Sequence, residues 1–588
     1  MRSRPLTGMA LAAVILTSAT PLPLPASALS VAPPVPSPVR CNPRAIDDAA
    51  RPMPRTGKVF APRQPMIAPP PPPPAPPPPP RASQGTQEMV VTGTRVQSPP
   101  LNAAAPIVTT AAHHAPPPDT ARYEGHAVAA IQSVAETPVS TFSVDVDTGS
   151  YSNVRRFLNQ GQVPPTAAVR TEEMINYFRY DYPAPKSRET PFTITTDVAR
   201  TPWNAETRLM RIGLRGYDTT SAERPPANLV FLVDVSGSMS PPDRLPLVKS
   251  ALMMLADKLT PRDRVSIVVY AGAAGIVLEP THDKNYVKQA LDCLQAGGST
   301  AGGAGLSLAY ATARASYIKG GINRILIATD GDFNVGVTNN ETLEDMVKRE
   351  REHGITLTTL GFGDNNYNEA LMESIADVGN GNYAYIDSAT EAQKVLDEEL
   401  SSTLFTIARD VKIQVEFNPA WVSEYRLIGY ENRLLAEDDF DNDRVDAGDI
   451  GAGHQVTAIY EVVPAGAKGW LPERRYEMNQ RLPGAGPASE LAYVKLRYKL
   501  PDGATSRLIE RTVPARAIAA AQRPHGDMAF AVAVAGFGQK LRGDKYLNGF
   551  GYVDVQRLAG VQQNFWRQEF VKLASLAGSR DTGGGGGR

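Results

Sequence analysis

The sequence has few of the residues that build metal clusters or disulfide frameworks. Only 2 cysteines and 7 histidines occur among 588 residues, too few for a disulfide-rich scaffold or a zinc module built on four cysteines. No HExxH pair is present, so a zinc hydrolase of that type is not expected. Basic and acidic residues nearly cancel, 60 against 61, and this balance argues against nucleic acid as the partner.

The two cysteines, Cys41 and Cys293, lie far apart in the sequence. Cys41 falls in a proline-rich segment, whereas Cys293 lies on the apolar face of a helix predicted over residues 286–294. We therefore expect one stray thiol and one buried thiol rather than a disulfide bond.

Long apolar runs are also missing. Residues 1–28 combine Arg2 and Arg4, a short apolar stretch and a small-x-small site at 26–28, which is the layout of a cleavable secretory signal peptide. No later stretch reaches the ~20 apolar residues that a membrane-spanning helix needs. We expect a protein exported to the periplasm or the cell surface, with no transmembrane segment after removal of the signal.

Proline is unevenly distributed along the chain. Of the 52 prolines, 31 precede residue 141, and the run 69–80 is broken only by Ala75. Such a run favours extended polyproline II structure. Residues 29–135 are therefore predicted to form a disordered tether, and deletion of residues 29–130 should leave the thermal unfolding of the remaining protein nearly unchanged.

A short alternating stretch interrupts the proline-rich segment between Glu88 and Arg95. It resembles the segment near the start of the plug in TonB-dependent outer-membrane transporters, which implies a link to the outer membrane or the TonB system. The plainer interpretation of so short a stretch is an unstructured patch.

Buried strands and amphipathic helices alternate through residues 223–403. Almost wholly apolar runs predict strands over 228–235, 265–270, 323–329 and 355–361. Helical patterns fall at 245–259, 302–318, 341–353 and 367–377. The alternation predicts the α/β class: a doubly wound, mostly parallel sheet with helices on both faces. Ligands bind at the carboxyl ends of the strands in such sheets.

Polar loops follow these strands. The first strand ends in the motif Asp234-x-Ser236-x-Ser238, Thr300 lies in a glycine-rich loop, and Asp330 directly follows the strand predicted over 323–329. These residues resemble the three loops of the von Willebrand factor type A (VWA) domain, where they form a metal-ion-dependent adhesion site (MIDAS). The resemblance implies that all five residues bind a divalent cation.

The chemistry of the five side chains agrees with that implication. Two carboxylates and several hydroxyls are hard oxygen donors that suit Mg²⁺, with Mn²⁺ or Ca²⁺ as alternatives. We expect both carboxylates at exposed strand ends rather than in the core, so that their loss weakens metal binding without unfolding the domain. The alternative is a Ser/Gly-rich turn that holds no metal.

Sequences before the VWA domain narrow the resemblance. The stretch from Ser140 to Tyr151 and the stretch from Val169 to Phe178 resemble the exported bacterial VWA proteins of the YfbK-like group. The likeness covers about 136–575 and implies an associated N-terminal domain and a C-terminal domain of uncharacterised function.

Two aspartates in the first of these stretches need their own interpretation. Asp145 and Asp147 could indicate a second cation. The apolar residues that alternate with polar ones around them are better explained by a half-buried strand.

The C-terminal part has alternating strands followed by helices. Strand patterns over 410–417, 425–430, 454–463 and 491–498 predict a small β-sandwich, and helices are predicted over 528–541 and about 553–577. The predicted organisation is a signal peptide (1–28), a tether (29–135), an associated N-terminal domain (136–222), a VWA domain (223–403), a β-sandwich (404–518), a helical segment (519–580) and a flexible Gly-rich tail (581–588).

No motif for catalysis is present. The sequence lacks a Gly-x-Ser-x-Gly elbow, a Walker loop and a metal-type histidine pair, so an enzyme is not expected. The VWA resemblance implies a metal-dependent protein-binding or adhesion module in the bacterial envelope, whose cation binds an Asp or Glu of a protein partner. The alternative is a structural envelope scaffold with a stabilising or vestigial metal site.

Overall fold

The computed structural model of the chain describes residues 39–40 and 121–581, except 221–223, 299–301, 332–339, 365–366, 399–401, 403, 473–488 and 502. The predicted signal peptide, most of the predicted tether, the stretch from Glu88 to Arg95 and almost all of the Gly-rich tail lie outside these residues. From Val39 onward the chain belongs to one compact unit.

The predicted α/β sheet has six strands in the order β10-β9-β8-β5-β6-β7. Their bounds are β5 Ala227–Asp234, β6 Arg264–Tyr270, β7 Ala274–Thr281, β8 Ile322–Thr329, β9 Thr356–Phe362 and β10 Tyr383–Ile386. Only β7 runs antiparallel to its neighbour, and the other pairs are parallel. The prediction of a doubly wound, mostly parallel sheet is confirmed.

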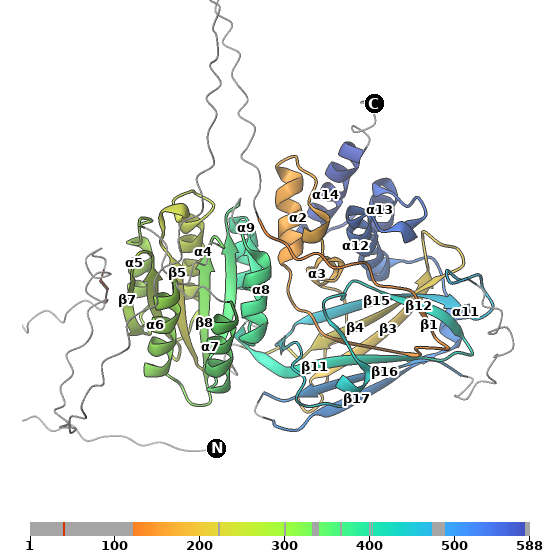
Figure 1. Ribbon diagram of the computed structural model, residues 1–588, viewed down its shortest axis with the longest axis horizontal. Helices are drawn as coiled ribbons and strands as arrows, with labels where there is room; N and C mark the ends of the chain where they lie inside the picture. The colour runs from red at the N-terminus through yellow and green to blue at the C-terminus, as the bar shows by residue number, and fades with distance from the viewer. Residues whose placement is uncertain are drawn as a thin grey trace, which may run out of the picture. The chain divides into compact units, whose positions relative to one another are not determined.

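Helices cover both faces of this sheet because its central strand is apolar on both sides (Figure 1). Leu229, Phe231 and Val233 of β5 pack into one hydrophobic cluster, whereas Val230 and Leu232 pack into another. One face carries α4 (Leu245–Lys258), α5 (Lys284–Asp292) and α9 (Ala389–Gln393). The opposite face carries α6 (Gly302–Ala315), α7 (Asn340–Glu352) and α8 (Glu369–Val378).

Two antiparallel sheets form the sandwich, in the orders β1-β12-β15-β4-β3 and β13-β2-β11-β16-β17, with β14 beside β11. Strands before the α/β domain are β1 Gln132–Ser133, β2 Val139–Ser143, β3 Phe192–Arg200 and β4 Arg208–Gly216. Strands after it are β11 Thr406–Phe417, β12 Val422–Ile428, β13 Leu434–Leu435, β14 Ile450–Gly451, β15 Gln455–Pro464, β16 Glu490–Lys499 and β17 Arg507–Pro514.

The strands on the two sides of the α/β domain pair with each other. β2 pairs with β11, and β4 pairs with β15. The segments that the sequence divides into 136–222 and 404–518 therefore share both sheets, and the α/β domain is inserted between β4 and β11. The alternating pattern of a strand shows which face is buried but does not show its partner, so the sequence order hides this exchange.

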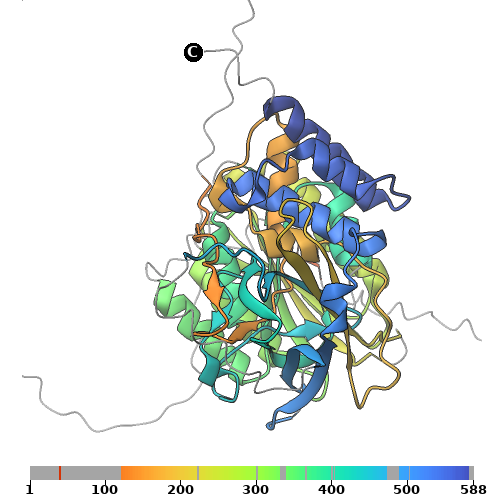
Figure 2. The same ribbon diagram turned by 90° about the vertical axis from the view of Figure 1, so that its right-hand side faces the viewer.

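Further helices pack on the two antiparallel sheets and on one another. They are α2 (Gly149–Asn159), α3 (Thr171–Asn176), α11 (Arg516–Ala519), α12 (Gly526–Arg542), α13 (Tyr552–Ala559) and α14 (Phe565–Asp581). Figure 2 shows the blue C-terminal helices beside the orange helix α2, and Phe178, Phe530 and Phe570 pack edge to face between them. No helix of the described residues is both long and apolar enough to cross a bilayer.

The prediction of one helix over 553–577 is wrong, because α13 and α14 are separate. Gly560 after α13 has a φ of +64°, a backbone conformation that residues with a Cβ rarely adopt. The chain therefore leaves the helix at this glycine and begins a second helix at Phe565. The apolar spacing on both sides of Gly560 resembled one continuous helical pattern.

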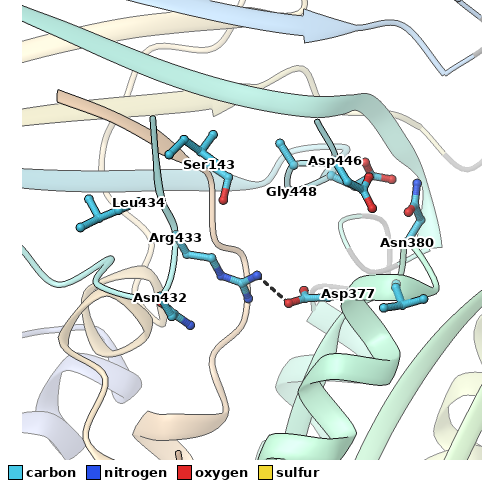
Figure 3. Close-up of a pocket in the computed structure, with 13 residues that line it drawn as sticks. Ser143, Asp377, Asn380, Asn432, Arg433, Leu434, Asp446 and Gly448 are labelled. Carbon is cyan, nitrogen blue, oxygen red and sulfur yellow. Dashed lines mark hydrogen bonds and ion pairs between the residues drawn. The ribbon is translucent and has the colours of Figure 1, made fainter. Parts of the chain in front are cut away.

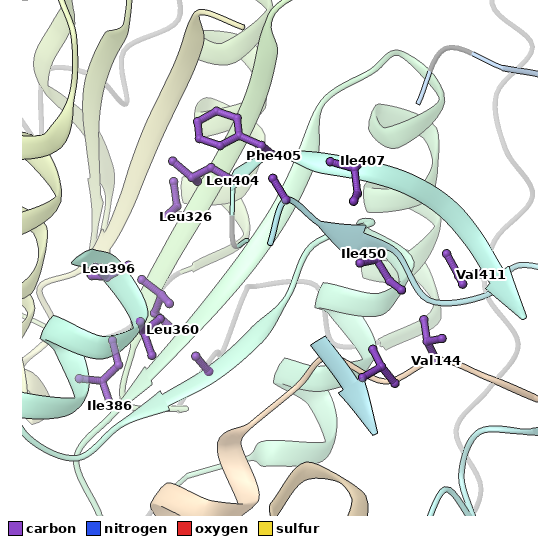
Figure 4. Packing of buried hydrophobic residues seen from close by; sticks show 14 of the residues in the cluster. Val144, Leu326, Leu360, Ile386, Leu396, Leu404, Phe405, Ile407, Val411 and Ile450 are labelled. Carbon is purple, nitrogen blue, oxygen red and sulfur yellow. The ribbon is translucent and has the colours of Figure 1, made fainter. Parts of the chain in front are cut away.

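One hydrophobic cluster runs from the α/β sheet into the sandwich (Figure 4). Leu360 and Leu396 belong to the α/β domain, Phe405 to the connection, and Ile407 and Val411 to β11. All five side chains are buried, and each such side chain stabilises the fold by about 1.5–3 kcal/mol relative to exposure. The inserted domain therefore packs directly against the sandwich.

The cysteine prediction is wrong, because Cys293 is disulfide-bonded and no described cysteine is free. The chain's other cysteine, Cys41, lies outside the described residues. Just before it, Val39 forms a bridge with Leu278 of β7, and the Arg40 N–H donates to the Val277 carbonyl at 2.9 Å. β7 is an edge strand with backbone groups open for pairing, so this part of the predicted tether contacts the α/β domain.

Candidate metal centre

The loops that carry the predicted metal residues meet at the carboxyl edge of two neighbouring strands. β5 ends at Asp234, and Ser236 and Ser238 follow it. β8 ends at Thr329, directly before Asp330. Because β5 and β8 are adjacent and parallel, both carboxylates lie at the same edge of the sheet, where α/β proteins bind their ligands.

The loop before Thr300 contacts the loop after β5 through hydrogen bonds of its glycines. Thr300 itself lies outside the described residues. Before it, the Gly297 N–H donates to the Val235 carbonyl at 2.8 Å, and the Gly237 N–H donates to the Gly298 carbonyl at 3.1 Å. The loop that leads to Thr300 is thus hydrogen-bonded to the loop that contains Ser236 and Ser238.

Asp234 is held by neutral donors on both carboxylate oxygens. The Ser236 N–H donates to Oδ1 at 2.8 Å, and the Thr329 hydroxyl donates to Oδ2 at 3.1 Å. The hydroxyl oxygens of Ser236 and Ser238 are 2.9 Å apart. The two serines therefore point toward one another from the same short turn.

The expectation that the two carboxylates are exposed is wrong. Asp234 is 0% exposed and Asp330 is 1% exposed. Burial raises the pKa of Asp234 to about 6, and the neighbouring Asp330 charge adds to the rise, while hydrogen bonds from Ser236 and Thr329 oppose it. Two buried carboxylates at one edge favour a cation between them.

Arg244 completes the centre, and the sequence analysis missed it. Its Nη1 forms an ion pair with Asp330 Oδ2 and donates to the Ser238 carbonyl at 2.9 Å. Its Nη2 donates to the Asp364 carbonyl at 2.6 Å. The available signal was a single basic residue shortly after the Asp-x-Ser-x-Ser motif and directly before α4.

Two glycines allow the loop after β9 to approach this arrangement. Gly331 has a φ of +87°, and a Cβ built there would lie 2.6 Å from the Asn368 nitrogen. Gly363 has a φ of +76°, and its Cβ would lie 2.4 Å from Arg244 Nε. A side chain at either position would separate elements that meet around Asp330.

The donors present fit a hard divalent cation. Among the described residues, no group of three or more His, Cys, Asp or Glu side chains is arranged to hold a metal. A cation at this centre would therefore depend on hydroxyl and water ligands in addition to Asp234 and Asp330, a combination that suits Mg²⁺. Ser236 and Ser238 supply those hydroxyls from the described residues.

A cavity of about 390 Å³ borders the metal loops. Asp243, Gly363 and Asp364 contribute to its wall from the α/β domain, and Arg156 of α2 contributes from the associated segment. Asp243 directly precedes Arg244 in the sequence, and Gly363 lies against the Arg244 side chain.

A second cavity, of about 280 Å³, contains none of the five predicted residues (Figure 3). Arg433 projects into it and donates to Asp377 at 2.6 Å. Arg433 also pairs with Asp145 and Asp147, at 3.2 Å each. The strand predicted around the two aspartates is observed as β2, but it ends at Ser143, so both aspartates follow it. The single charge of Arg433 is shared by these two carboxylates and those of Glu373 and Asp377.

Three family models match the chain. The model described as von Willebrand factor type A domain matches residues 228–398, the model described as von Willebrand factor matches 117–211, and the model of the C-terminal part of the uncharacterized protein YfbK matches 402–579. Uncharacterized protein YfbK of Escherichia coli (strain K12) is 48% identical over 470 residues, which cover 78% of this chain and 81% of that protein. The chain belongs to the YfbK family. The expected family is confirmed, and its VWA domain is of a kind that often binds proteins through a MIDAS cation.

Other similarities of this YfbK-family protein cover less. Uncharacterized protein sll0103 of Synechocystis is 33% identical over 189 residues, which cover 32% of this chain and 43% of that protein. The structure of von Willebrand factor type A from Catenulispora acidiphila covers 65% of this chain and 88% of its own, with 17% identity and a TM-score of 0.37. The structure of proximal thread matrix protein 1 from the mussel byssus, described with a zinc-occupied MIDAS, covers 32% of this chain and 46% of its own, with 20% identity and a TM-score of 0.25.

Proposed function

We propose that this YfbK-family protein is a metal-dependent protein-binding module of the bacterial envelope. Asp234, Ser236, Ser238, Thr300 and Asp330 hold Mg²⁺, with Mn²⁺ or Ca²⁺ as alternatives, and the partner presents an Asp or Glu side chain. One observation carries the proposal: two buried carboxylates and a pair of serine hydroxyls meet at the carboxyl edge of β5 and β8 in a VWA domain.

The donor set explains why the site would bind a partner. When bound, the cation supplies a Lewis-acid centre for a carboxylate, because the hydroxyl ligands add no negative charge to that of Asp234 and Asp330. Ser236 and Ser238 keep their hydroxyls at the centre through their shared turn. Asp234 is fixed by Ser236 and Thr329, so the carboxylate is positioned before the cation arrives.

The predicted signal peptide supports a location outside the cytoplasm, in the periplasm or at the cell surface. The proposal is a binding role rather than catalysis, because no nucleophile or acid–base pair is recognised in the sequence. A structural scaffold with a stabilising or vestigial metal site is the competing function, and the experiments below separate the two.

The first experiment measures the metal. Calorimetric titration of the full chain should show Mg²⁺ binding in the wild type and at least about a tenfold loss of affinity in Asp234→Ala and in Asp330→Ala, since each variant removes a charged ligand. Asp257→Ala is the matched control, because this half-exposed carboxylate on α4 pairs with Lys288. Equal Mg²⁺ affinity in all four proteins would remove the assignment of the site.

The second experiment measures the partner. Capture of a partner protein from an envelope extract should require Mg²⁺ and disappear in EDTA. Thr300→Ala should weaken this capture more than it lowers the stability of the folded chain. Neutralising acidic residues of the captured protein one at a time should identify the carboxylate. Capture that persists in EDTA, or that no single acidic residue affects, would leave the scaffold function standing.

A further inference from the structure

A positive charge already lies at the third loop of the metal centre. The Arg244 guanidinium contacts the Asp330 carboxylate, the Ser238 carbonyl and the Asp364 carbonyl. These acceptors come from the loops after β8, β5 and β9, respectively. The side chain is only 10% exposed, so Arg244 links the three loops in one buried position.

The surrounding structure accommodates Arg244 specifically. A Cβ at Gly363 would lie 2.6 Å from its Cγ and 2.4 Å from its Nε, so only glycine leaves room for the arginine along this path. Asp364 meets Arg244 through its backbone carbonyl, whereas its carboxylate accepts a hydrogen bond from Gln160 at 3.1 Å. Asp330 is therefore the carboxylate that Arg244 pairs with.

The charges at the centre show what this arginine does. Asp234 and Asp330 together carry two negative charges, which one divalent cation cancels, and the serine and threonine hydroxyls are neutral. Without Arg244 a loaded centre would have no net charge to attract an anion. With Arg244 its net charge is positive by one, which one carboxylate of a partner would cancel.

We propose that Arg244 determines the specificity of the centre for an anionic partner. Its guanidinium repels the divalent cation at the shared Asp330 carboxylate and keeps the loaded centre positive, so that cation and partner carboxylate bind cooperatively. The inference rests on the proposed metal-dependent function. These electrostatic interactions are strong because charges in a buried site are poorly screened by water or salt.

The test is a calorimetric Mg²⁺ titration of the full chain, with and without the tripeptide Gly-Asp-Gly as the carboxylate probe. Arg244→Gln should bind Mg²⁺ about tenfold more tightly than the wild type in the absence of the probe, because the repulsion is gone. The probe should raise the Mg²⁺ affinity of the wild type and have little effect on that of Arg244→Gln.

Two further variants complete the comparison. Arg244→Lys keeps the charge and should stay close to the wild type in both titrations. Lys249→Gln is the matched control, because Lys249 lies on the same helix and donates to the Asp292 and Leu294 carbonyls without contacting the metal loops. Its Mg²⁺ affinity should change less than about twofold.

The outcomes separate this inference from the proposed function. Absence of Mg²⁺ binding in the wild type would remove the metal site and the inference together. Mg²⁺ binding in the wild type with weaker binding in Arg244→Gln would overturn only the inference and make Arg244 a residue that merely positions the loops. If Arg244→Gln does not fold, a large loss of Mg²⁺ affinity in Arg244→Lys would overturn it instead.

Discussion

Two places in this protein bury carboxylates beside arginines, and they do so differently. In the first, the metal centre, Asp234 accepts only from neutral donors, and one guanidinium contacts Asp330. The second, here called the ionic junction, consists of Arg155, Arg170, Arg433 and the carboxylates that they bind between the α/β domain and the rest of the chain.

At the ionic junction each arginine connects elements far apart in sequence. Arg155 of α2 binds Asp387 and Glu391 of the α/β domain and Glu569 of α14. Glu373, which Arg170 and Arg433 bind, and Glu369, which lies beside the junction and accepts from Asn153 and Tyr383, hold protons more tightly, since burial raises the pKa of each to about 7. The same residue types thus connect distant elements at the ionic junction, whereas at the candidate metal centre Asp234 accepts from Ser236 and Thr329, which are neutral donors.

The largest effect should come from breaking the ionic junction. Arg155→Ala leaves Asp387 and Glu391 buried without their cation, so we expect a loss of about 3–5 kcal/mol in the free energy of unfolding, measured by urea denaturation. The control is Arg557→Ala, which removes a mostly exposed partner of Asp554 and should cost less than about 1 kcal/mol. Equal losses in the two variants would contradict a structural role for the junction.

An intermediate effect, of opposite sign, should come from the metal centre. Burial raises the pKa of Asp234 from 3.8 to about 6, so the stability that its protonated form contributes is lost as the pH rises through about 6. In EDTA at pH 7.5, Asp234→Asn should therefore unfold no more easily than the wild type, with a gain on the order of 1–3 kcal/mol.

Bound Mg²⁺ should stabilise the wild type more than Asp234→Asn, which opposes the order expected in EDTA. Mg²⁺ at a hundred times the wild-type dissociation constant should stabilise the wild type by about 2.7 kcal/mol, and it should stabilise Asp234→Asn by no more than about 1.4 kcal/mol if the variant binds at least tenfold more weakly. Thermal unfolding with and without Mg²⁺ measures both effects. A collapse of Asp234→Asn in EDTA, like that expected of Arg155→Ala, would make the carboxylate a structural residue.

The smallest effect should be a pH dependence at the ionic junction. Glu369 is 1% exposed and accepts from Asn153 and Tyr383. Burial is the main cause that raises its pKa from 4.5 to about 7. Its contribution to stability is thus fully present below pH 4.5 and lost as the pH rises through about 7.

Glu369→Gln stays neutral at every pH and should lose less stability over this range. The difference in unfolding free energy between variant and wild type should move in favour of the variant by about 1–2 kcal/mol from pH 4.5 to pH 8. Urea titrations at these two pH values measure it. A difference that does not change with pH would show that the Glu369 carboxyl has the same pKa in the folded and unfolded chain.

Local sequence patterns were sufficient to predict most helices and strands of the α/β domain. The strand predicted over 228–235 is observed as Ala227–Asp234, and the helix predicted over 245–259 is observed as Leu245–Lys258. A run of apolar residues and an amphipathic repeat are properties of neighbouring residues, so they are visible before the chain folds. The order of the three metal loops was visible in the same way.

The tertiary structure alone decided how those elements meet. The exchange of strands across the inserted domain and the disulfide bond of Cys293 join residues far apart in the chain. So does the pairing of Arg244 with Asp330, which are 86 residues apart. By itself the sequence indicated the candidate metal residues and, for Asp234 and Asp330, the strand ends at which they lie. Only the packing of loops decided that Asp234 and Asp330 are buried and that Arg244 neutralises one of them, because burial and charge pairing depend on distances in space.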